Sequence, residues 1–183
     1  MLRNCVVLAG VVLLSGCAST GGGMGGGSIE VKGAGDQLED QITISTIGYN
    51  RPFLGVVELG TGDPFFRVYI DKSDKKVVSQ QLYVYTNNYD WMNWDEARFR
   101  MGDDLVKIPM TKVASDVDCS KYGCFHSEDV VGTITNNQLQ YFASQEQPIT
   151  IRLTSSRVTE HTDVEISPDE VKAFLEEVEK QTN

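Results

Sequence analysis

Short runs of alternating apolar and polar residues fill the chain after its first 36 residues, and such runs predict β-strands. In residues 77–86, for example, Tyr83 and Tyr85 share one face of the expected strand, and the aliphatic residues beside them share the other. Turn-forming residues separate the runs, notably at 60–64, 71–74 and 102–104. The predicted strands cover residues 42–47, 55–59, 65–70, 77–86, 97–101, 105–113, 130–135, 149–154 and 157–166.

The C-terminal segment predicts an amphipathic helix. Ser167, followed three residues later by Glu170, has the spacing of a capping box, and Pro168 stands at the first helical position. Apolar residues then recur at helical spacing, at 171, 174, 175 and 178, which predicts a surface helix with one buried stripe. A second, shorter helix is expected at 136–144.

Strands predominate, and helices do not alternate with them, which argues against a parallel α/β sheet. The sequence therefore predicts a mainly β fold, either a β-sandwich or an open barrel of about eight short strands with one C-terminal amphipathic helix. Its size suits a single β-rich domain, which we expect to span residues 37–183.

The N-terminal segment is apolar but short, because residues 5–14 fall well below the ~20 residues that span a bilayer. A basic residue before this run and small residues after it are typical of a removable signal peptide, residues 1–16. The motif Leu14-Ser15-Gly16-Cys17 resembles the lipobox of bacterial lipoproteins. The resemblance implies export, cleavage before Cys17 and acylation of that cysteine, and Ala18 implies passage to the outer membrane, facing the periplasm. The alternative is an ordinary secretory signal cut elsewhere, for example after Ala18.

Residues 17–36 read as the lipidated cysteine and a flexible tether. Residues 18–36 hold 8 of the 17 glycines, and a Gly-rich segment of this length has a root-mean-square span of roughly 25 Å. A phosphate-cradling loop is the alternative use of so much glycine. Such loops follow a strand and open a helix, and neither condition holds here.

The composition is acidic, since 16 basic residues against 26 acidic ones give a formal net charge of −10. Removal of residues 1–16 takes away Arg3 and leaves 15 basic residues, for a charge of −11. No stripe rich in lysine or arginine is present, so the sequence gives no support for nucleic-acid binding.

Apart from Cys17, the processed chain holds two cysteines, Cys119 and Cys124. A disulfide between them is the favoured interpretation in an oxidising periplasm, and closing so short a loop contributes about 2 kcal/mol in the chain-entropy model. The alternative is a metal site in which both cysteines join His126 and His161, the only two histidines.

No catalytic constellation stands out. Ser127 or Cys124, together with His126 and Glu128 or Asp129, supplies the residue types of a triad, but neighbouring residues of a strand point to opposite faces. The Gly-x-Ser-x-Gly and Ser-x-x-Lys motifs are absent. We therefore assign no catalytic residue, no metal ligand and no cofactor.

Residues 83–94 form the most unusual stretch, with both tryptophans and three of the seven tyrosines. If exposed, Tyr89, Trp91 and Trp94 are a candidate platform for a sugar or peptide ligand. The alternative, which we favour, is that Trp91 and Trp94 cover one end of the sandwich, because large aromatic side chains dominate core burial.

As a whole the domain resembles uncharacterised proteobacterial lipoproteins in general layout, and that resemblance implies no residue roles. We expect a non-enzymatic cell-envelope lipoprotein, a structural or binding module for a periplasmic protein or a cell-wall component, attached to the membrane by its lipid anchor. Two alternatives stay open. One is an envelope hydrolase acting on a glycan or peptide, and the other is a metal-binding envelope protein.

Overall fold

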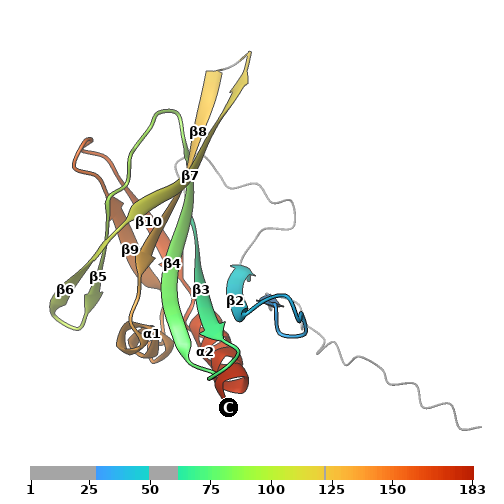
Figure 1. The fold of residues 1–183 in the computed structure, drawn as a ribbon. Coiled ribbons are helices and arrows are strands. Elements are labelled where there is room, and N and C mark those ends of the chain that lie inside the picture. Colours follow the sequence, from blue (N-terminus) through green and yellow to red (C-terminus); the bar gives the residue numbers. More distant parts are fainter. Residues whose placement is uncertain (1–27, 50–61, 122) are drawn as a thin grey trace, which may run out of the picture.

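A computed structural model describes residues 28–49, 62–121 and 123–183. Cys17 and the predicted strand at 55–59 lie outside these residues. Within the described residues, ten strands form two antiparallel sheets, and two helices lie at one end of them (Figure 1). This confirms the predicted mainly β architecture with a C-terminal helix.

The larger sheet has six strands in the order β1-β2-β3-β4-β8-β7. Their bounds are β1 Ser28–Lys32, β2 Gln41–Gly48, β3 Gly62–Asp71, β4 Val77–Asn88, β7 Thr111–Ser120 and β8 Gly123–Thr133. The smaller sheet has four strands in the order β10-β9-β5-β6. Their bounds are β5 Glu96–Met101, β6 Asp104–Pro109, β9 Ile149–Thr154 and β10 His161–Ile166. The helices are α1 Asn136–Ala143 and α2 Pro168–Thr182.

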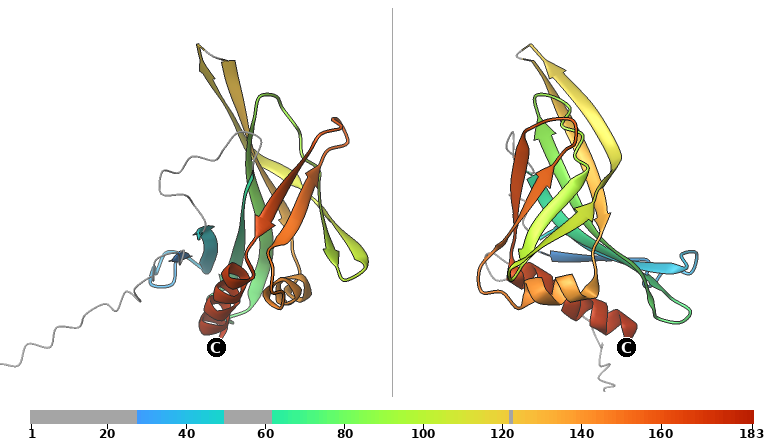
Figure 2. Two further views of the ribbon diagram at one scale, coloured as in Figure 1. Left: turned by 180° about the vertical axis from the view of Figure 1, so that it is seen from behind. Right: turned by 90° about the vertical axis from the view of Figure 1, so that its left-hand side faces the viewer.

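Apolar side chains from both sheets form one core between them, and α1 and α2 close it at one end (Figure 2). The alternation predicted for β4 is confirmed, because Leu82 and Val84 are fully buried whereas Tyr83 and Tyr85 are only partly covered. Core members that are fully buried include Ile44, Phe66, Leu82, Val84, Ala97, Ile151, Leu153 and Phe174.

The structure corrects the N-terminal boundary of the domain. Ser28–Lys32, which we assigned to the tether, forms β1 and pairs antiparallel with β2. The segment alternates apolar and polar side chains, and its Ile29 packs against the core. The surrounding glycines obscured this pattern in the sequence. Residues before Gln37 therefore belong to the β domain as well.

The predicted strand at 105–113 is also corrected, because the chain changes sheets in its middle. β6 ends at Pro109, and β7 begins at Thr111 in the other sheet. Met110 between them donates its N–H to the carbonyl of Asp95 at 2.9 Å. Gly132 on β8 allows the corner to pack closely, because a Cβ there would lie 2.6 Å from Met110 Sδ and 2.9 Å from Pro109 O.

Other strand limits shift as well. β3 begins at Gly62, inside the predicted turn at 60–64, and β8 begins at Gly123, well before the predicted start at Val130. β10 pairs with β9 as expected but begins at His161 instead of Arg157. The earlier start of β8 lengthens its hairpin with β7, which the candidate site uses.

Both predicted helices are present, but the capping box of α2 is wrong. Ser167 caps the helix by accepting from Asp169 N, and Pro168 stands in the first turn as expected. The Glu170 side chain does not reach back to the cap. It is 1 % exposed and accepts a hydrogen bond from Thr46 Oγ1 on β2. The helix thus uses its third residue to hold the sheet.

Candidate functional site

The hairpin of β7 and β8, which we call the arm (Thr111–Thr133), projects away from the sandwich at the end opposite the helices (Figure 1). β7 is an edge strand of the six-stranded sheet, and all ten of its residues are exposed. An edge strand presents unpaired backbone groups along its outer side. Two apolar side chains on it are also open to solvent, Val113 at 52 % and Val117 at 42 %.

The tip of the arm is closed by a disulfide between Cys119 and Cys124, which lie directly opposite each other on β7 and β8. Gly123, where β8 begins, has a φ of +134°, a conformation that favours glycine. The disulfide joins the two strands at the point where a long hairpin would otherwise separate most easily.

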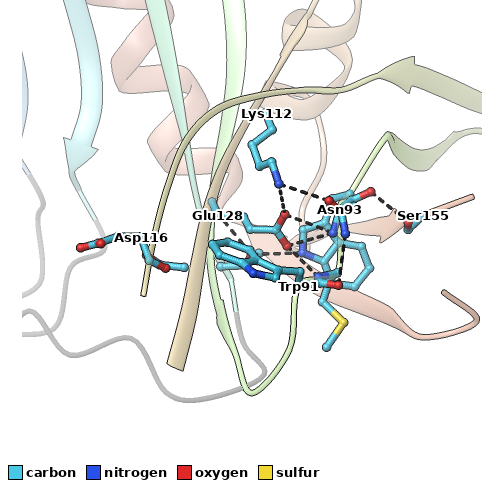
Figure 3. A network of polar contacts seen from close by, with 10 residues as sticks. Trp91, Asn93, Lys112, Asp116, Glu128 and Ser155 are labelled. Atoms are coloured by element: carbon cyan, nitrogen blue, oxygen red, sulfur yellow. Dashed lines mark hydrogen bonds and ion pairs between the residues drawn. The ribbon is translucent and has the colours of Figure 1, made fainter. Parts of the chain in front are cut away.

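The base of the arm is fixed by a buried carboxylate (Figure 3). Glu128 on β8 is 0 % exposed and occupies the same face as Val130, which belongs to the core. Its Oε2 accepts the backbone N–H of Met92 at 2.9 Å and that of Asn93 at 3.0 Å. These bonds tie the arm to the segment that links β4 to β5.

Lys112 on β7 completes this contact. Its Nζ lies 3.1 Å from Glu128 Oε1 and 3.2 Å from Asn93 Oδ1, so the buried negative charge has a cationic partner. The ammonium also lies 5.0 Å from the centre of the Trp91 ring, within the range of a cation–π contact. One lysine therefore joins the edge strand, the carboxylate and the linking segment.

The linking segment is itself held in an unusual conformation. Asn93 has a φ of +53°, a left-handed conformation that asparagine tolerates better than most residues. Its carbonyl accepts from Ser155 Oγ at 2.9 Å, at the end of β9 in the other sheet. The network around Glu128 thus spans both sheets, as Figure 3 shows.

The three aromatic residues of the candidate platform separate in the structure. Trp94 is 2 % exposed, and its Nε1 donates to Thr86 Oγ1 at 3.1 Å, so it lies in the core and offers no exposed face. Trp91 is partly buried against His126, with ring centres 4.7 Å apart. Tyr89 is 64 % exposed and lies beside Phe125, with ring centres 5.5 Å apart. The structure brings Tyr89 and Trp91 to the arm and assigns Trp94 to packing.

The residues considered for a triad are divided between the two faces of β8. Both Glu128 oxygens accept hydrogen bonds from the protein, and the side chain is 0 % exposed. His126 Nδ1 lies 2.8 Å from the carbonyl of Tyr89, and Ser127 points to the other face of β8. The residues considered for a triad are therefore not assembled.

The metal alternative meets a similar obstacle in the described residues. Cys119 and Cys124 are joined by the disulfide and offer no thiolate. In residues 28–49, 62–121 and 123–183, no group of three histidine, cysteine, aspartate or glutamate side chains is placed to hold an ion.

Sequence reasoning missed Lys112 and Glu128 as a pair. One signal was available for Glu128, since the alternation along β8 places this acid in phase with Val130 and Gly132, at a position where a core residue is expected. Nothing in the local pattern pointed to Lys112, which comes from the other strand of the arm.

None of the helices in the described part of the chain has both the length and the apolar character to cross a bilayer. No protein-family model, curated protein or solved structure matches the chain. Functional assignment therefore depends on the residues themselves.

Proposed function

We propose that this chain is a non-enzymatic lipoprotein of the bacterial cell envelope, attached through Cys17, whose β domain binds a partner protein of the envelope through the arm. The observation that carries the proposal is the fully exposed β7, an edge strand on a hairpin fixed at both ends. An edge strand can accept an extended segment of another chain as an additional strand, with main-chain hydrogen bonds supplying affinity.

Fixation at both ends supports this role physically. Binding is weakened by the entropy lost when a mobile element becomes ordered, so an element that is already ordered binds more tightly. The disulfide holds the tip, and the contact of Glu128 with Lys112 holds the base. The arm is thus organised before any partner arrives.

Charge on β7 indicates the chemistry of the partner segment. Asp116 and Asp118 are exposed in its distal half, on either side of the apolar Val117 and close to the disulfide. The Asp116 side chain accepts the N–H of Val117 at 2.8 Å, which protects one backbone donor from indiscriminate pairing. A segment with apolar and basic residues complements this strand, because opposite charges favour the encounter and suppress other partners.

Site-specific crosslinking in cells tests the docking surface. A photoactivatable phenylalanine analogue replaces Val113 or Val117 on β7, and Val78 on β4, which is 56 % exposed, serves as the matched control. We expect a discrete protein adduct from the two β7 positions and none from Val78. Equal adducts from all three positions, or adducts to the cell wall alone, would contradict docking of a protein on β7.

The anchor is tested separately, since Cys17 lies outside the described residues. Growth with labelled palmitate is expected to label the wild-type chain, and Cys17→Ala is expected to abolish the label and release the chain into the soluble periplasmic fraction. Membrane fractionation of the wild type is expected to recover it with the outer membrane. Retention of the label in Cys17→Ala would overturn the assignment of the anchor.

A further inference from the structure

A cavity of about 890 Å³ opens on the outer face of the four-stranded sheet, between β5, β6 and β9 and the segment that follows α1. We call it the arginine pocket, because its floor carries Arg98, Arg100 and Arg152. None of its lining residues belongs to the arm. Its volume lies within the range of about 300–1,000 Å³ that is usual for small-molecule sites.

The three arginines are brought together by strand register. Arg98 on β5 lies directly opposite Arg152 on β9, and Arg100 follows two residues later on the same face of β5. Like charges directly opposite each other destabilise a sheet. The strongly acidic chain nevertheless gathers three cations on one patch of this sheet.

Two of these arginines are held in place by carboxylates that lie outside the pocket. Arg152 donates through Nε and Nη2 to the Asp163 carboxylate at 2.7 and 2.6 Å, and Arg98 donates through Nε to Glu96. Neither acid lines the cavity. The hydrogen bond from Arg152 holds the pKa of Asp163 below its ordinary value, so this acid stays ionised and fixes the guanidinium.

Donors remain after these contacts. A guanidinium has five N–H groups, and the contacts of Arg152 with Asp163 occupy two of them. Arg100 donates to the backbone carbonyl of Asp103 at 2.9 Å. Within the described ranges, no carboxylate lies within 4.0 Å of its guanidinium. The arginine pocket thus presents oriented donors that the protein itself does not satisfy.

The walls of the pocket suit an organic anion better than a bare ion. Tyr141 Oη accepts the N–H of Gly102 at 3.0 Å, which leaves its hydroxyl hydrogen free to donate into the cavity. Leu105 lines the cavity and is 52 % exposed, so it offers an apolar surface beside the cations. Glu146 is the one carboxylate among the lining residues, and it opposes the binding of an anion.

We propose that the arginine pocket binds a small organic anion, whose carboxylate or phosphate group contacts Arg98, Arg100 and Arg152 and whose body packs against Leu105 and Tyr141. Guanidinium groups match the geometry of both anionic groups, because two parallel N–H donors face two oxygens. This site is independent of the docking role of the arm, so either proposal can fail without the other.

Calorimetric titration of the full-length chain in a neutral detergent tests the site. The probes are benzoate and phenyl phosphate, with phenol as the uncharged control of the same ring and inorganic phosphate as the control without a ring. We expect one of the two organic anions to bind at one site, and the stronger of them identifies the anionic group. Phenol and inorganic phosphate are expected to bind at least about tenfold more weakly, a difference of about 1.4 kcal/mol.

Three variants decide whether the pocket is responsible. Arg100→Gln removes the cation without a carboxylate partner and is expected to weaken binding about tenfold or more, whereas Glu146→Gln is expected to strengthen it severalfold. Arg157→Gln, a matched change outside the pocket, is expected to leave affinity unchanged. Equal affinity for phenol and benzoate, or equal weakening by Arg100→Gln and Arg157→Gln, would overturn the proposal.

Discussion

The base of the arm and the arginine pocket both gather charged side chains on a β-sheet, but they differ in how completely the protein satisfies them. Glu128 at the base is 0 % exposed, and both of its oxygens accept donors from the chain. The side chains of Arg98 and Arg152 in the pocket are 39 % and 49 % exposed and keep unused donors.

This difference separates a structural cluster from a binding surface. A buried charge without partners carries a large desolvation cost, so the network at Glu128 stabilises the fold only because it is complete. An incomplete set of donors is tolerated where water reaches it, and a ligand can then replace that water. Whether the protein satisfies the donors and acceptors of a charged cluster is therefore a better guide to its role than the number of charges in it.

The largest effect is expected at the base of the arm. Glu128→Leu leaves the N–H groups of Met92 and Asn93 without their acceptor and removes the carboxylate partner of Lys112, and each buried donor left unsatisfied costs about 1–3 kcal/mol. Urea unfolding followed by circular dichroism measures the loss. Glu128→Gln, which keeps the size and one acceptor oxygen, is expected to lose less.

Arg100→Gln in the pocket is the control for this comparison. Its side chain is exposed, and surface substitutions of this kind usually change stability by less than about 0.5 kcal/mol. If Glu128→Leu lowers the free energy of unfolding no more than Arg100→Gln does, the distinction between a structural base and a binding pocket is contradicted.

An intermediate effect is expected at the tip of the arm. Replacing Cys119 and Cys124 with alanine removes a crosslink that contributes about 2 kcal/mol in the chain-entropy model. The opening should be local, so amides of β7 and β8 near the tip are expected to exchange with solvent faster while those of β5 and β9 keep their rates. Hydrogen exchange read by mass spectrometry distinguishes this outcome from a uniform increase, which would mean that the tip is coupled to the whole sandwich.

The smallest effect is expected when acid weakens the contact between Arg152 and Asp163, beside the pocket. The hydrogen bond from Arg152 lowers the pKa of Asp163 below its ordinary value of 3.8, so the stability it contributes is present above that value and is lost as pH falls through the folded pKa. Arg152→Gln returns this pKa toward its ordinary value and is expected to reduce the loss of stability between near-neutral pH and about pH 3. Melting temperatures of both proteins across this range check the sign. A steeper loss in the variant would contradict it.

Local patterns predicted much of the fold because alternation and capping residues act over a few positions. The strands at 77–86 and 149–154 and the stripe on α2 follow from such patterns. The prediction for 105–113 failed because the change of sheets at Met110 depends on a bond to Asp95 and on the close approach allowed by Gly132. The prediction of a capping box was wrong because the Glu170 side chain accepts a hydrogen bond from the distant Thr46.

The candidate site could be predicted only in part, because it too depends on contacts between distant residues. The aromatic stretch pointed to the region of Tyr89 and Trp91, but it could not separate these residues from Trp94, whose indole N–H is satisfied by Thr86 inside the core. The arm itself was missed, since its length depends on pairing between β7 and β8 and not on the alternation of either strand alone.

The sequence by itself determined the mainly β class, the two helices and the nearness of Cys119 to Cys124, because each depends on residues a few positions apart. Only the tertiary structure decided that Glu128 lies buried against Lys112 and that Arg98 lies opposite Arg152. The physical reason is that the role of a charged side chain is set by its burial and by donors or acceptors from other strands. The sequence shows which side chains are charged, and the packing of the two sheets decides which of these charges have a partner of opposite charge.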